Sequence, residues 1–503
     1  MNALVPHFPV LQVVIPLITA PLIVLFRNKN AAWLLATLCA FVGFYISAEL
    51  LQTVRDSGAI TYNIGNWPRH VGIVYHIDVA NAYILMIISA IAVFVFPYAK
   101  YSVEKEIDEH KIHFFYAAMI LCLTGLMGIA ATGDAFNVFV FLEVSSLSTY
   151  AIVAMGDKKG EPPRASLAAY RYLIMGTIGG TFILLGIGFL YMMTGTLNMA
   201  ELSEKIPAMS DTSTIRAALA FITVGSSIKL ALFPLHMWLP NTYTYAPSVV
   251  SAFLSSTATK VSYYVLLRVL FTLFGVSLAA QATQLKFFIA PMALIAIFLG
   301  SLNAIKQTNI KKLLAFSSIA QIGYMVLGLA FNNINGLTGG IIHLFNHALM
   351  KGGLFLVVGC IYYRMNSVDL KDLKGIGRLM PWTMFAFTLG GLGMIGVPFT
   401  AGFISKWYLV LGALDADSWS MAALILIASL LAVIYIFKVL EVAYFQKPDE
   451  GVKVQEAPLA MLVPTYALIL ASIYFGIETD PMLSAAQEAA EMLWNIGIPK
   501  GGA

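Results

Sequence analysis

The chain has 503 residues, of which 59% are hydrophobic and only 11% are charged. Soluble domains carry about 25% charged residues, so this composition excludes an ordinary water-soluble domain and indicates a protein surrounded by lipid. The net charge of +4 is spread over many loops without a basic block, so no nucleic-acid partner is expected.

Taken in chain order, the apolar runs predict about fourteen transmembrane helices, because a bilayer core requires about 20 residues per helix. The runs are continuous and lack ten-residue alternation, which favours helices over the strands of a membrane barrel. The first run is interpreted as a retained helix, because no basic leader precedes it. The expected spans are 9–26, 32–54, 78–99, 112–131, 134–155, 164–194, 214–239, 244–275, 287–305, 311–331, 336–362, 381–412, 419–445 and 458–477. The predicted fold class is therefore all-α and polytopic.

Basic residues fall mainly in alternate loops. The loops after the first, third, fifth, ninth, eleventh and thirteenth spans hold more than half of the 30 lysines and arginines. Because basic loops face the cytoplasm, both termini are expected outside, in a multi-pass protein of the cell (inner) membrane. The polar stretch 55–77 is interpreted as an outside loop or a short hairpin.

Several charged residues remain inside the expected spans, where a charge costs at least about 2.5–3.5 kcal/mol. Glu143, in FNVFVFLEVSSLSTYAIVA, needs a nearby cation to stay charged. Arg268 lies near a span end and is expected to extend to the membrane surface. Lys438 and Glu441 lie three residues apart and are expected to pair with each other.

Two further lysines accompany proline interruptions. Lys229 precedes Pro234 in GSSIKLALFPLHMWLP, and Lys406 follows Pro398 in GMIGVPFTAGFISKWYLV. A proline breaks or kinks a helix, and broken helices at mid-membrane are where transporters place ion sites. Lys260 lies among hydroxyls in SSTATKVSYYVLL. These lysines either take part in ion transfer or form local ion pairs that fix packing.

The stretch GGIIHLFNHALMKGG, residues 339–353, places His343, His347 and Lys351 four residues apart, on one helix face. Three groups that can hold or release a proton favour proton transfer over packing alone. A haem is disfavoured because two histidines on one helix cannot sandwich one iron. A metal ion is disfavoured because Lys351 would repel it and no carboxylate or cysteine lies nearby. No cofactor, metal site or catalytic residue is expected.

No linker divides the chain, so residues 1–503 are expected to form a single membrane domain. Spans four to eight (112–275) and nine to thirteen (287–445) form two sets of five, in each of which the fourth member is an interrupted helix with a lysine. Consecutive repeats with an odd number of spans insert in opposite orientations, which predicts an inverted repeat. Residues 1–111 are then three N-terminal helices, and 458–503 the last helix and a tail.

Five motifs together resemble the antiporter-like subunits of respiratory complex I, membrane-bound hydrogenases and Mrp-type multisubunit cation/proton antiporters. They are FLEVSSL, KLALFPLHMWLP, YAPSVVSAFLSSTATKVSYYVLLR, HLFNHALMKGG and VPFTAGFISKW. The resemblance covers roughly residues 80–445, and the chain most resembles the D subunit of Mrp-type antiporters. It implies fourteen helices in two inverted five-helix repeats, a hydrated polar axis at the midplane, and no cofactor in this subunit.

By motif match, the resemblance also implies a proton path. Its members are Glu143, Lys229, Lys260, His343, His347, Lys351 and Lys406. Two departures argue against particular complex I subunits: the chain ends soon after the last span, without the long lateral helix of the largest one, and Lys406 stands where the subunit in the middle position has glutamate. The remaining complex I type and the hydrogenase relatives stay open.

The expected function is proton translocation within a multisubunit membrane complex, with Mrp-type Na⁺/H⁺ antiport as the first hypothesis. The expected partners are other subunits, the lipid bilayer and protons, with passage of sodium left open. A pumping subunit of a redox-driven complex is the alternative. A carrier for an organic solute is disfavoured, because a string of titratable residues on several helices fits protons better than a ligand. The chain is not expected to be an enzyme on its own.

Overall fold

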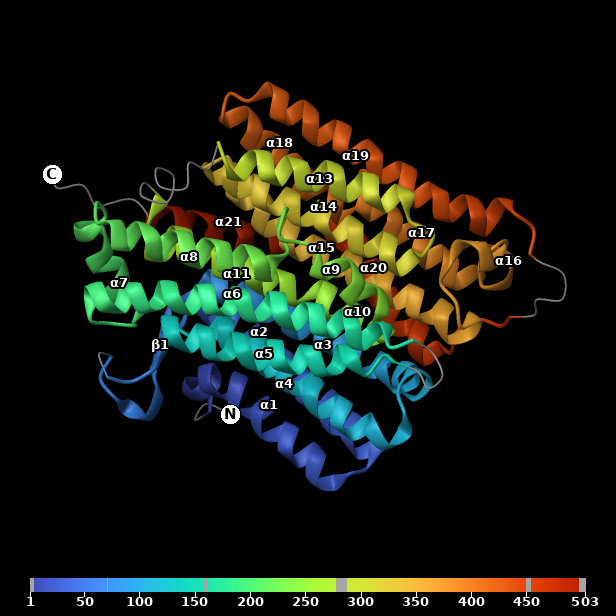
Figure 1. Ribbon diagram of the computed structural model, residues 1–503, viewed down its shortest axis with the longest axis horizontal. Coiled ribbons are helices and arrows are strands. Elements are labelled where there is room, and N and C mark those ends of the chain that lie inside the picture. The colour runs from blue at the N-terminus through green and yellow to red at the C-terminus, as the bar shows by residue number, and fades with distance from the viewer. Residues whose placement is uncertain (1–3, 70, 158–161, 277–286, 449–453, 497–503) are drawn as a thin grey trace.

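The computed structural model describes residues 4–69, 71–157, 162–276, 287–448 and 454–496. Parts of the basic loops, including Lys158, Lys159 and Lys453, lie outside the described residues. Most helices run along the long axis of the molecule (Figure 1). The hairpin strand β1 and helix α7 lie at one end of this axis, and α16 lies at the other.

The N-terminal part contains three long helices and a hairpin. They are α1 (Phe8–Phe26), α2 (Lys29–Ser57), β1 (Ile60–Asn63), β2 (Val74–Ile77) and α3 (Val79–Glu106). The two strands pair antiparallel with Ile60 opposite Ile77, so the polar stretch 55–77 contains a hairpin. Asp78 follows β2 directly and caps α3, since its side chain accepts hydrogen bonds from the first backbone N–H groups of that helix.

The middle part begins with three long helices, and shorter, interrupted ones follow. It consists of α4 (Ile112–Ala131), α5 (Ala135–Ala154), α6 (Arg164–Thr194), α7 (Met199–Lys205), α8 (Ser213–Leu230), α9 (Trp238–Tyr245), α10 (Ser248–Ser256), α11 (Ala258–Leu267) and the π-helix η5 (Arg268–Leu273).

The last part likewise begins with three long helices, which interrupted ones follow. It consists of α13 (Ile289–Lys306), α14 (Ile310–Ala330), α15 (Ile334–Met365), α16 (Ile376–Leu379), α17 (Pro381–Ile395), α18 (Ala401–Asp415), α19 (Trp419–Leu440) with the π-helix η7 (Glu441–Phe445), α20 (Leu459–Ile477) and α21 (Asp480–Ile496). Short 3₁₀ turns lie at Val5–His7, Ile64–Asn66, Glu109–Lys111, Ile206–Met209 and Leu370–Asp372.

Within the described residues, 11 helices are long and apolar enough to cross a membrane. The predicted spans 214–239, 244–275 and 381–412 are each built from consecutive shorter helices: α8 and α9, α10 with α11 and η5, and α17 and α18. The all-α, multi-pass class is therefore confirmed, and the total of fourteen spans stays a prediction.

Helix α15 lies at the centre of the second half, where α10, α14, α18 and α20 surround it. Every residue from Gly336 to Ile361 is buried. Packing follows a similar order in the two halves: α4 packs on α5 as α13 packs on α14, and α5 packs on α6 as α14 packs on α15. This parallel is compatible with the predicted repeat, whose boundaries stay a prediction.

Helix α21 occupies residues that the sequence pattern assigns to a tail. Its buried face is made almost entirely of alanine (Ala485, Ala486, Ala489 and Ala490), and it packs against α3 and α15. An ion pair of 2.7 Å between Arg55 and Glu488 also fixes it to α2. An alanine face adds little hydropathy, so a search for long apolar runs does not find such a helix.

Candidate functional site

A break in the chain places Lys229 in the interior. Between α8 and α9 the backbone leaves the helical conformation: Ala231 has a left-handed φ of 60°, and Pro234 lies in the non-helical segment. Lys229 belongs to the last turn of α8. The indole N–H of Trp238, the first residue of α9, donates to the carbonyl of Ile228 at 2.9 Å. The same carbonyl accepts from the Ala231 N–H at 3.1 Å, so this contact ties the start of α9 to the end of α8.

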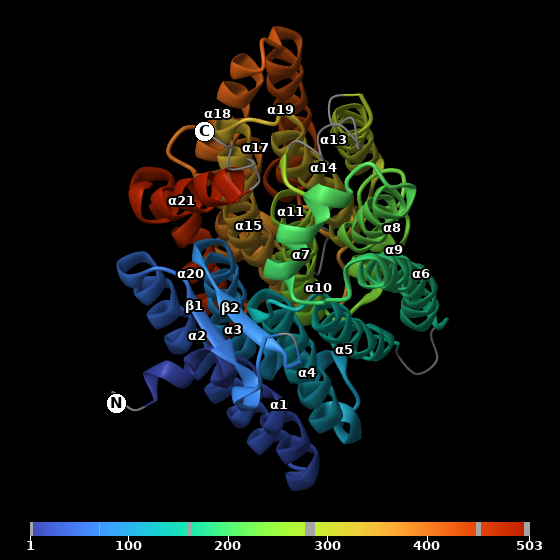
Figure 2. The ribbon, with the colours of Figure 1, turned by 90° about the vertical axis from the view of Figure 1, so that its left-hand side faces the viewer.

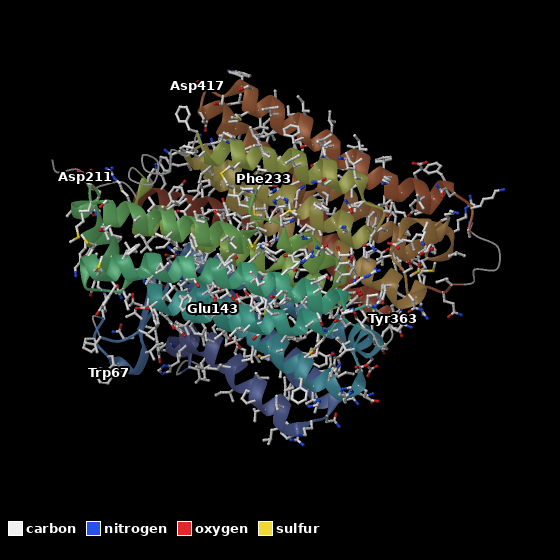
Figure 3. All side chains as sticks on the ribbon, viewed as in Figure 1. Trp67, Glu143, Asp211, Phe233, Tyr363 and Asp417 are labelled. Atoms are coloured by element: carbon white, nitrogen blue, oxygen red, sulfur yellow. The ribbon has the colours of Figure 1, made fainter. Side chains whose placement is uncertain are left out.

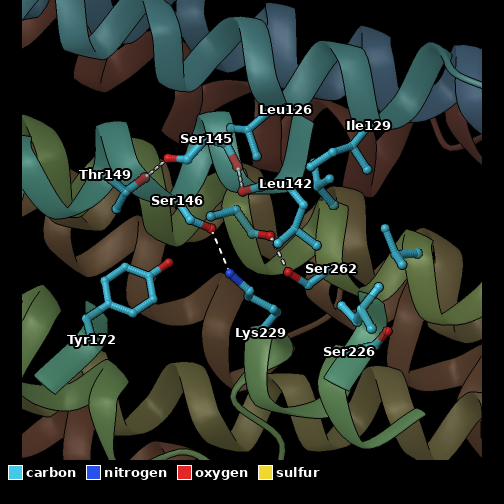
Figure 4. A pocket seen from close by; sticks show the side chains of 14 residues that line it. Leu126, Ile129, Leu142, Ser145, Ser146, Thr149, Tyr172, Ser226, Lys229 and Ser262 are labelled. Atoms are coloured by element: carbon cyan, nitrogen blue, oxygen red, sulfur yellow. Dashed lines mark hydrogen bonds between the residues drawn. The ribbon is translucent and has the colours of Figure 1, made fainter. Parts of the chain in front are cut away.

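Lys229 and Glu143 form an ion pair between α8 and α5. The ammonium lies 3.4 Å from the Glu143 Oε1 and 2.8 Å from the Ser146 hydroxyl. Figure 4 shows Lys229 pointing toward Ser146 in a pocket whose other polar groups are mostly hydroxyls. The lysine side chain is 5% exposed and the glutamate 26%, and Figure 3 places Glu143 between the two ends of the molecule. A carboxylate and an ammonium thus meet at mid-bundle.

Lys260 lies at a second break, between α10 and α11. Thr257 separates the two helices with a non-helical backbone (φ −124°, ψ −59°). The Lys260 ammonium donates to the carbonyl of Ser255, at the end of α10, and lies 3.4 Å from the Thr259 hydroxyl. Its side chain is completely buried. No carboxylate pairs with it within the described part of the chain.

The three residues of α15 follow one another along the buried helix. The rings of His343 and His347 are parallel, with centroids 6.0 Å apart. The His343 Nδ1 is 2.8 Å from the Ser405 hydroxyl. The Lys351 ammonium donates to the Leu314 carbonyl at 2.7 Å and also to a serine hydroxyl of α14. Neither ring nitrogen of His347 has a hydrogen-bond partner among the described residues.

Lys406 belongs to α18, and its side chain reaches back across the break between α17 and α18, the segment that contains Pro398. Helix α17 ends at Ile395, and Gly396 follows as its C-cap with a φ of 85°, which favours glycine. The Lys406 ammonium donates to the last carbonyls of α17, at 2.7 Å to Ile395 and 3.2 Å to Met394. The negative end of the helix dipole also favours a cation at this position. Lys406 follows its helix break in the sequence, whereas Lys229 precedes its own.

Lys438 is a further lysine that binds the end of a helix. It donates to the carbonyls of Ile305 and Gln307, at the end of α13, at 2.8 and 2.9 Å. The prediction that Lys438 pairs with Glu441 is therefore wrong, because the ammonium turns to carbonyls at the end of another helix, which such an end leaves without backbone partners. Lys438 remains partly exposed.

The structure brings together Glu143 and Lys229 directly, but it leaves Lys260, the α15 residues and Lys406 without hydrogen bonds to one another within the described residues. Other buried polar atoms have no hydrogen-bond partner in the described part of the chain, and ordered water is expected to bridge such atoms. They include Ser256 Oγ, Gln321 Oε1, Tyr324 Oη, Thr338 Oγ1 and Tyr435 Oη. Sequence reasoning missed them, since single hydroxyls in apolar helices carry no distinct signal.

The same residues offer no ready metal site. Among the described residues, no group of three or more histidine, cysteine, aspartate or glutamate side chains lies close enough to hold an ion. The buried lysine ammonium groups instead donate to carbonyls and hydroxyls. This arrangement suits proton exchange between side chains and water, which requires no other bond to form or break.

Titratable side chains in the interior of a helical membrane protein, placed at broken helices, are typical of ion-translocating membrane subunits. This chain is a member of that class. Within that class, the chain belongs to the NADH:quinone oxidoreductase/Mrp antiporter transmembrane family, whose model matches residues 132–432. The family resemblance seen in the sequence motifs is thus confirmed.

Two relatives and one solved structure show the breadth of this family. The chain is 39% identical to the N subunit of the NADH-quinone oxidoreductase of Desulforudis audaxviator, over 95% of this chain and 97% of the relative. It is 29% identical to the D subunit of the Na⁺/H⁺ antiporter of Bacillus subtilis, over 97% of each chain. A chain of the membrane-bound sulfane sulfur reductase, an archaeal respiratory membrane complex, matches with a TM-score of 0.89, 27% identity, and coverage of 97% of this chain and 98% of that one.

Proposed function

We propose that this chain translocates protons across the membrane as an antiporter-like subunit of a multisubunit complex. The observation that carries the proposal is the ion pair that Lys229 of α8 forms with Glu143 of α5. Family membership and the multisubunit relatives support the same function. The proposed path consists of Glu143, Lys229, Lys260, His343, His347, Lys351 and Lys406, with breaks at Pro234 and Pro398.

The ion pair supplies the switch of this mechanism. A buried ammonium is stable only while a counter-charge or good hydrogen bonds compensate for its lost hydration. If Glu143 is neutralised by a proton or drawn away from Lys229, the ammonium keeps only the neutral Ser146 hydroxyl. Its free energy then rises, and Lys229 releases a proton to water or to the next acceptor.

Lys260 and the α15 residues continue the path. Water molecules bridging the unpartnered hydroxyls between them would carry the proton by successive exchange. Histidine suits the centre because its ordinary pKa lies near neutrality. Lys406 then receives the proton at the end of α17, where two carbonyls hold the ammonium in place. Only bonds to hydrogen change in each step.

A partner subunit is expected to cover Glu143. The Glu143 side chain is 26% exposed although it lies at mid-bundle. A charge that faced lipid there would cost at least about 2.5–3.5 kcal/mol. A neighbouring subunit with a polar or cationic group at this position removes that cost, and it also provides a means of drawing Glu143 away from Lys229.

For the driving reaction, Mrp-type Na⁺/H⁺ exchange is our first proposal, supported by the similarity to the D subunit of a Na⁺/H⁺ antiporter along nearly the whole chain. Redox-driven pumping is the second candidate, supported by the 39% identity to the N subunit of an NADH-quinone oxidoreductase. The two differ in partners, because only the second requires subunits that carry redox centres. Purification of the complex with mass spectrometry of its subunits decides between them.

The basic loops also support an orientation. Lys111, Lys306, Lys374 and Arg378 belong to loops in the alternate set that carries most of the positive charge. By the positive-inside rule these loops face the cytoplasm, so both termini and the β1–β2 hairpin are proposed to face outside, in a cell (inner) membrane.

The test of the function uses the intact complex in sealed vesicles. An imposed Na⁺ gradient, or substrate oxidation where redox subunits are found, should drive proton movement that a pH-sensitive dye reports. Replacement of Glu143 by glutamine keeps the shape of the side chain and removes its charge, so the proton signal should be lost while the complex still assembles. Full proton movement in an assembled Glu143→Gln complex would disprove the proposal.

A further inference from the structure

A second buried ion pair joins the hairpin to the helix that follows Lys260. The Arg268 guanidinium donates to the Asp78 carboxylate, and the two side chains are 7% and 5% exposed. The prediction that Arg268 extends to the membrane surface is therefore wrong. Arg268 Nε also donates to the Tyr264 hydroxyl at 2.9 Å, and that hydroxyl donates to the Ala130 carbonyl. The pair thus fixes η5 to the start of α3 and the end of α4.

A cavity of about 200 Å³ lies on the hairpin side of this pair. Its polar lining includes His76, Asp78, Asn198 and Arg268. His76 is 46% exposed, and its Nε2 lies 4.0 Å from the second oxygen of Asp78. Figure 2 looks onto this end of the molecule, where β1, β2 and α7 lie together. The cavity is large enough for several water molecules and reaches inward as far as Arg268.

Two smaller cavities, each of about 30 Å³, continue from this one toward Lys229. The middle cavity shares Tyr264 and Arg268 with the hairpin cavity. It shares Ile129, Ile183 and Val265 with the innermost cavity. The innermost cavity is the one that contains Lys229. The three therefore form one line from the hairpin end to the Glu143–Lys229 pair.

The line changes in character along its length. Polar side chains contribute to the lining at both of its ends, whereas the middle cavity is lined mainly by aliphatic side chains, including Ile129, Val138, Ile187 and Val265. A small apolar space does not hold water stably, because water needs two to four polar partners. Arg268 and Tyr264 stand at the entrance to this space and are held there by Asp78 and the α4 carbonyl.

The backbone that carries Arg268 is unusual as well. Arg268 opens the π-helix η5, directly after the regular helix α11. Such π segments are rare and concentrate at functional sites, because they widen a helix turn at a cost in regular hydrogen bonding. A functional element at this position could control the passage between the hairpin cavity and the middle cavity, since Arg268 lines both of them.

We propose that the hairpin end of the chain is a second opening for water and protons toward the Glu143–Lys229 pair, closed in this structure by Arg268 and held closed by Asp78. Movement of Arg268 out of the junction lets water enter the apolar middle cavity and connects the His76 side with Lys229. This inference rests on the proposed function for its purpose, whereas the opening itself is a physical property that can be measured without transport.

The test measures access of a small ion from the hairpin side to the innermost cavity. Ser262, which lines that cavity, is replaced by cysteine in the full complex, with Cys39, Cys122 and Cys360 changed to alanine. Sealed vesicles then receive silver ions on the hairpin side, and the loss of maleimide labelling reports the reaction rate of the thiol. Ser472→Cys, a buried serine of α20 that lines none of these three cavities, is the matched control.

Asp78→Asn removes the charge that holds Arg268 and keeps the cap of α3, because asparagine caps a helix as well as aspartate does. In this background the silver reaction at Ser262→Cys should accelerate about tenfold, as expected when a minor open state gains one decade in population. The thiol of Ser472→Cys should react at the parent rate. An unchanged rate at Ser262→Cys, or an equal acceleration at both positions, would overturn the inference.

A second variant tests the apolar segment without touching the ion pair. Val265→Thr keeps the shape of the side chain and adds a hydroxyl to the middle cavity, so it should also accelerate the silver reaction at Ser262→Cys. No acceleration would contradict a closure based on the apolar segment. The two hypotheses can be rejected separately. If Asp78→Asn leaves the silver reaction rate unchanged while Glu143→Gln still abolishes proton movement, the proposed opening is rejected and the proposed function is retained.

Discussion

The Lys406 ammonium lies 2.7 Å from the carbonyl oxygen of Ile395, across the break between α17 and α18. The end of α17 leaves carbonyls without backbone partners, and the Lys406 ammonium has no carboxylate partner in the described part of the structure. This one contact gives each group a partner. Lys260 makes the same kind of contact with the end of α10. Breaking a helix inside the membrane therefore produces the carbonyls that keep a buried lysine in place, and the lysine can exchange protons there.

The first prediction separates this proton role from the helix-capping role. Lys406→Met removes a donor from two carbonyls, which costs about 1–3 kcal/mol of stability, and it should also reduce proton movement in vesicles by about tenfold or more. Lys438→Met is the matched control, because Lys438 likewise binds two carbonyls at a helix end but lies off the proposed path. It should show a similar loss of thermal stability with nearly normal transport.

Equal losses of transport in the two variants would show that capping alone explains Lys406. The comparison requires complexes at matched assembly, which blue native gels and the ratio of subunits in purified samples establish.

Much of the fold could be predicted from the sequence, because hydropathy is a property of each segment alone. Long apolar runs fix α2, α3 and α15, and the proline positions coincide with the non-helical segments around Pro234 and Pro398. The pairing of charges could be predicted only where an unpaired charge inside the membrane would be too costly. A carboxylate at Glu143 requires a cation, and Lys229 lies 86 residues away at 3.4 Å.

The parts that could not be predicted depend on contacts between distant segments. Arg268 and Asp78 are 190 residues apart in the chain, and neither local periodicity nor hydropathy relates them. The partners of Lys438 are backbone carbonyls, which every residue has, so no residue type marks them. Unpartnered hydroxyls such as that of Tyr435 become informative only when the space around them is known.

The second prediction concerns the surface next to Glu143. Leu147 lies one turn further along α5 and is 58% exposed. A photoreactive probe attached through Leu147→Cys should cross-link this chain to a neighbouring subunit in the native complex, because the glutamate beside it needs a protein cover. Mass spectrometry of the product identifies the partner. Adducts with lipid alone would contradict the proposed cover.

The third prediction tests the centre of the path. Neither ring nitrogen of His347 has a hydrogen-bond partner among the described residues, and an unsatisfied buried polar group costs about 1–3 kcal/mol. His347→Leu should therefore leave thermal stability unchanged or raise it, while proton movement falls. A residue that served packing alone would give the opposite pattern. Normal transport in His347→Leu would remove this histidine from the path.

The fourth prediction uses two glycines of α6, of which Gly180 is buried and Gly188 exposed. A Cβ at Gly180 would lie 2.4 Å from the Glu143 Oε1, whereas a Cβ at Gly188 would meet no atom within 4 Å. Gly180→Ala should push the carboxylate away from Lys229 and lower proton movement in vesicles without preventing assembly. Gly188→Ala should transport normally and stabilise the helix by up to about 1 kcal/mol. Equal transport in the two variants would show that the position of the carboxylate relative to Lys229 does not control proton release.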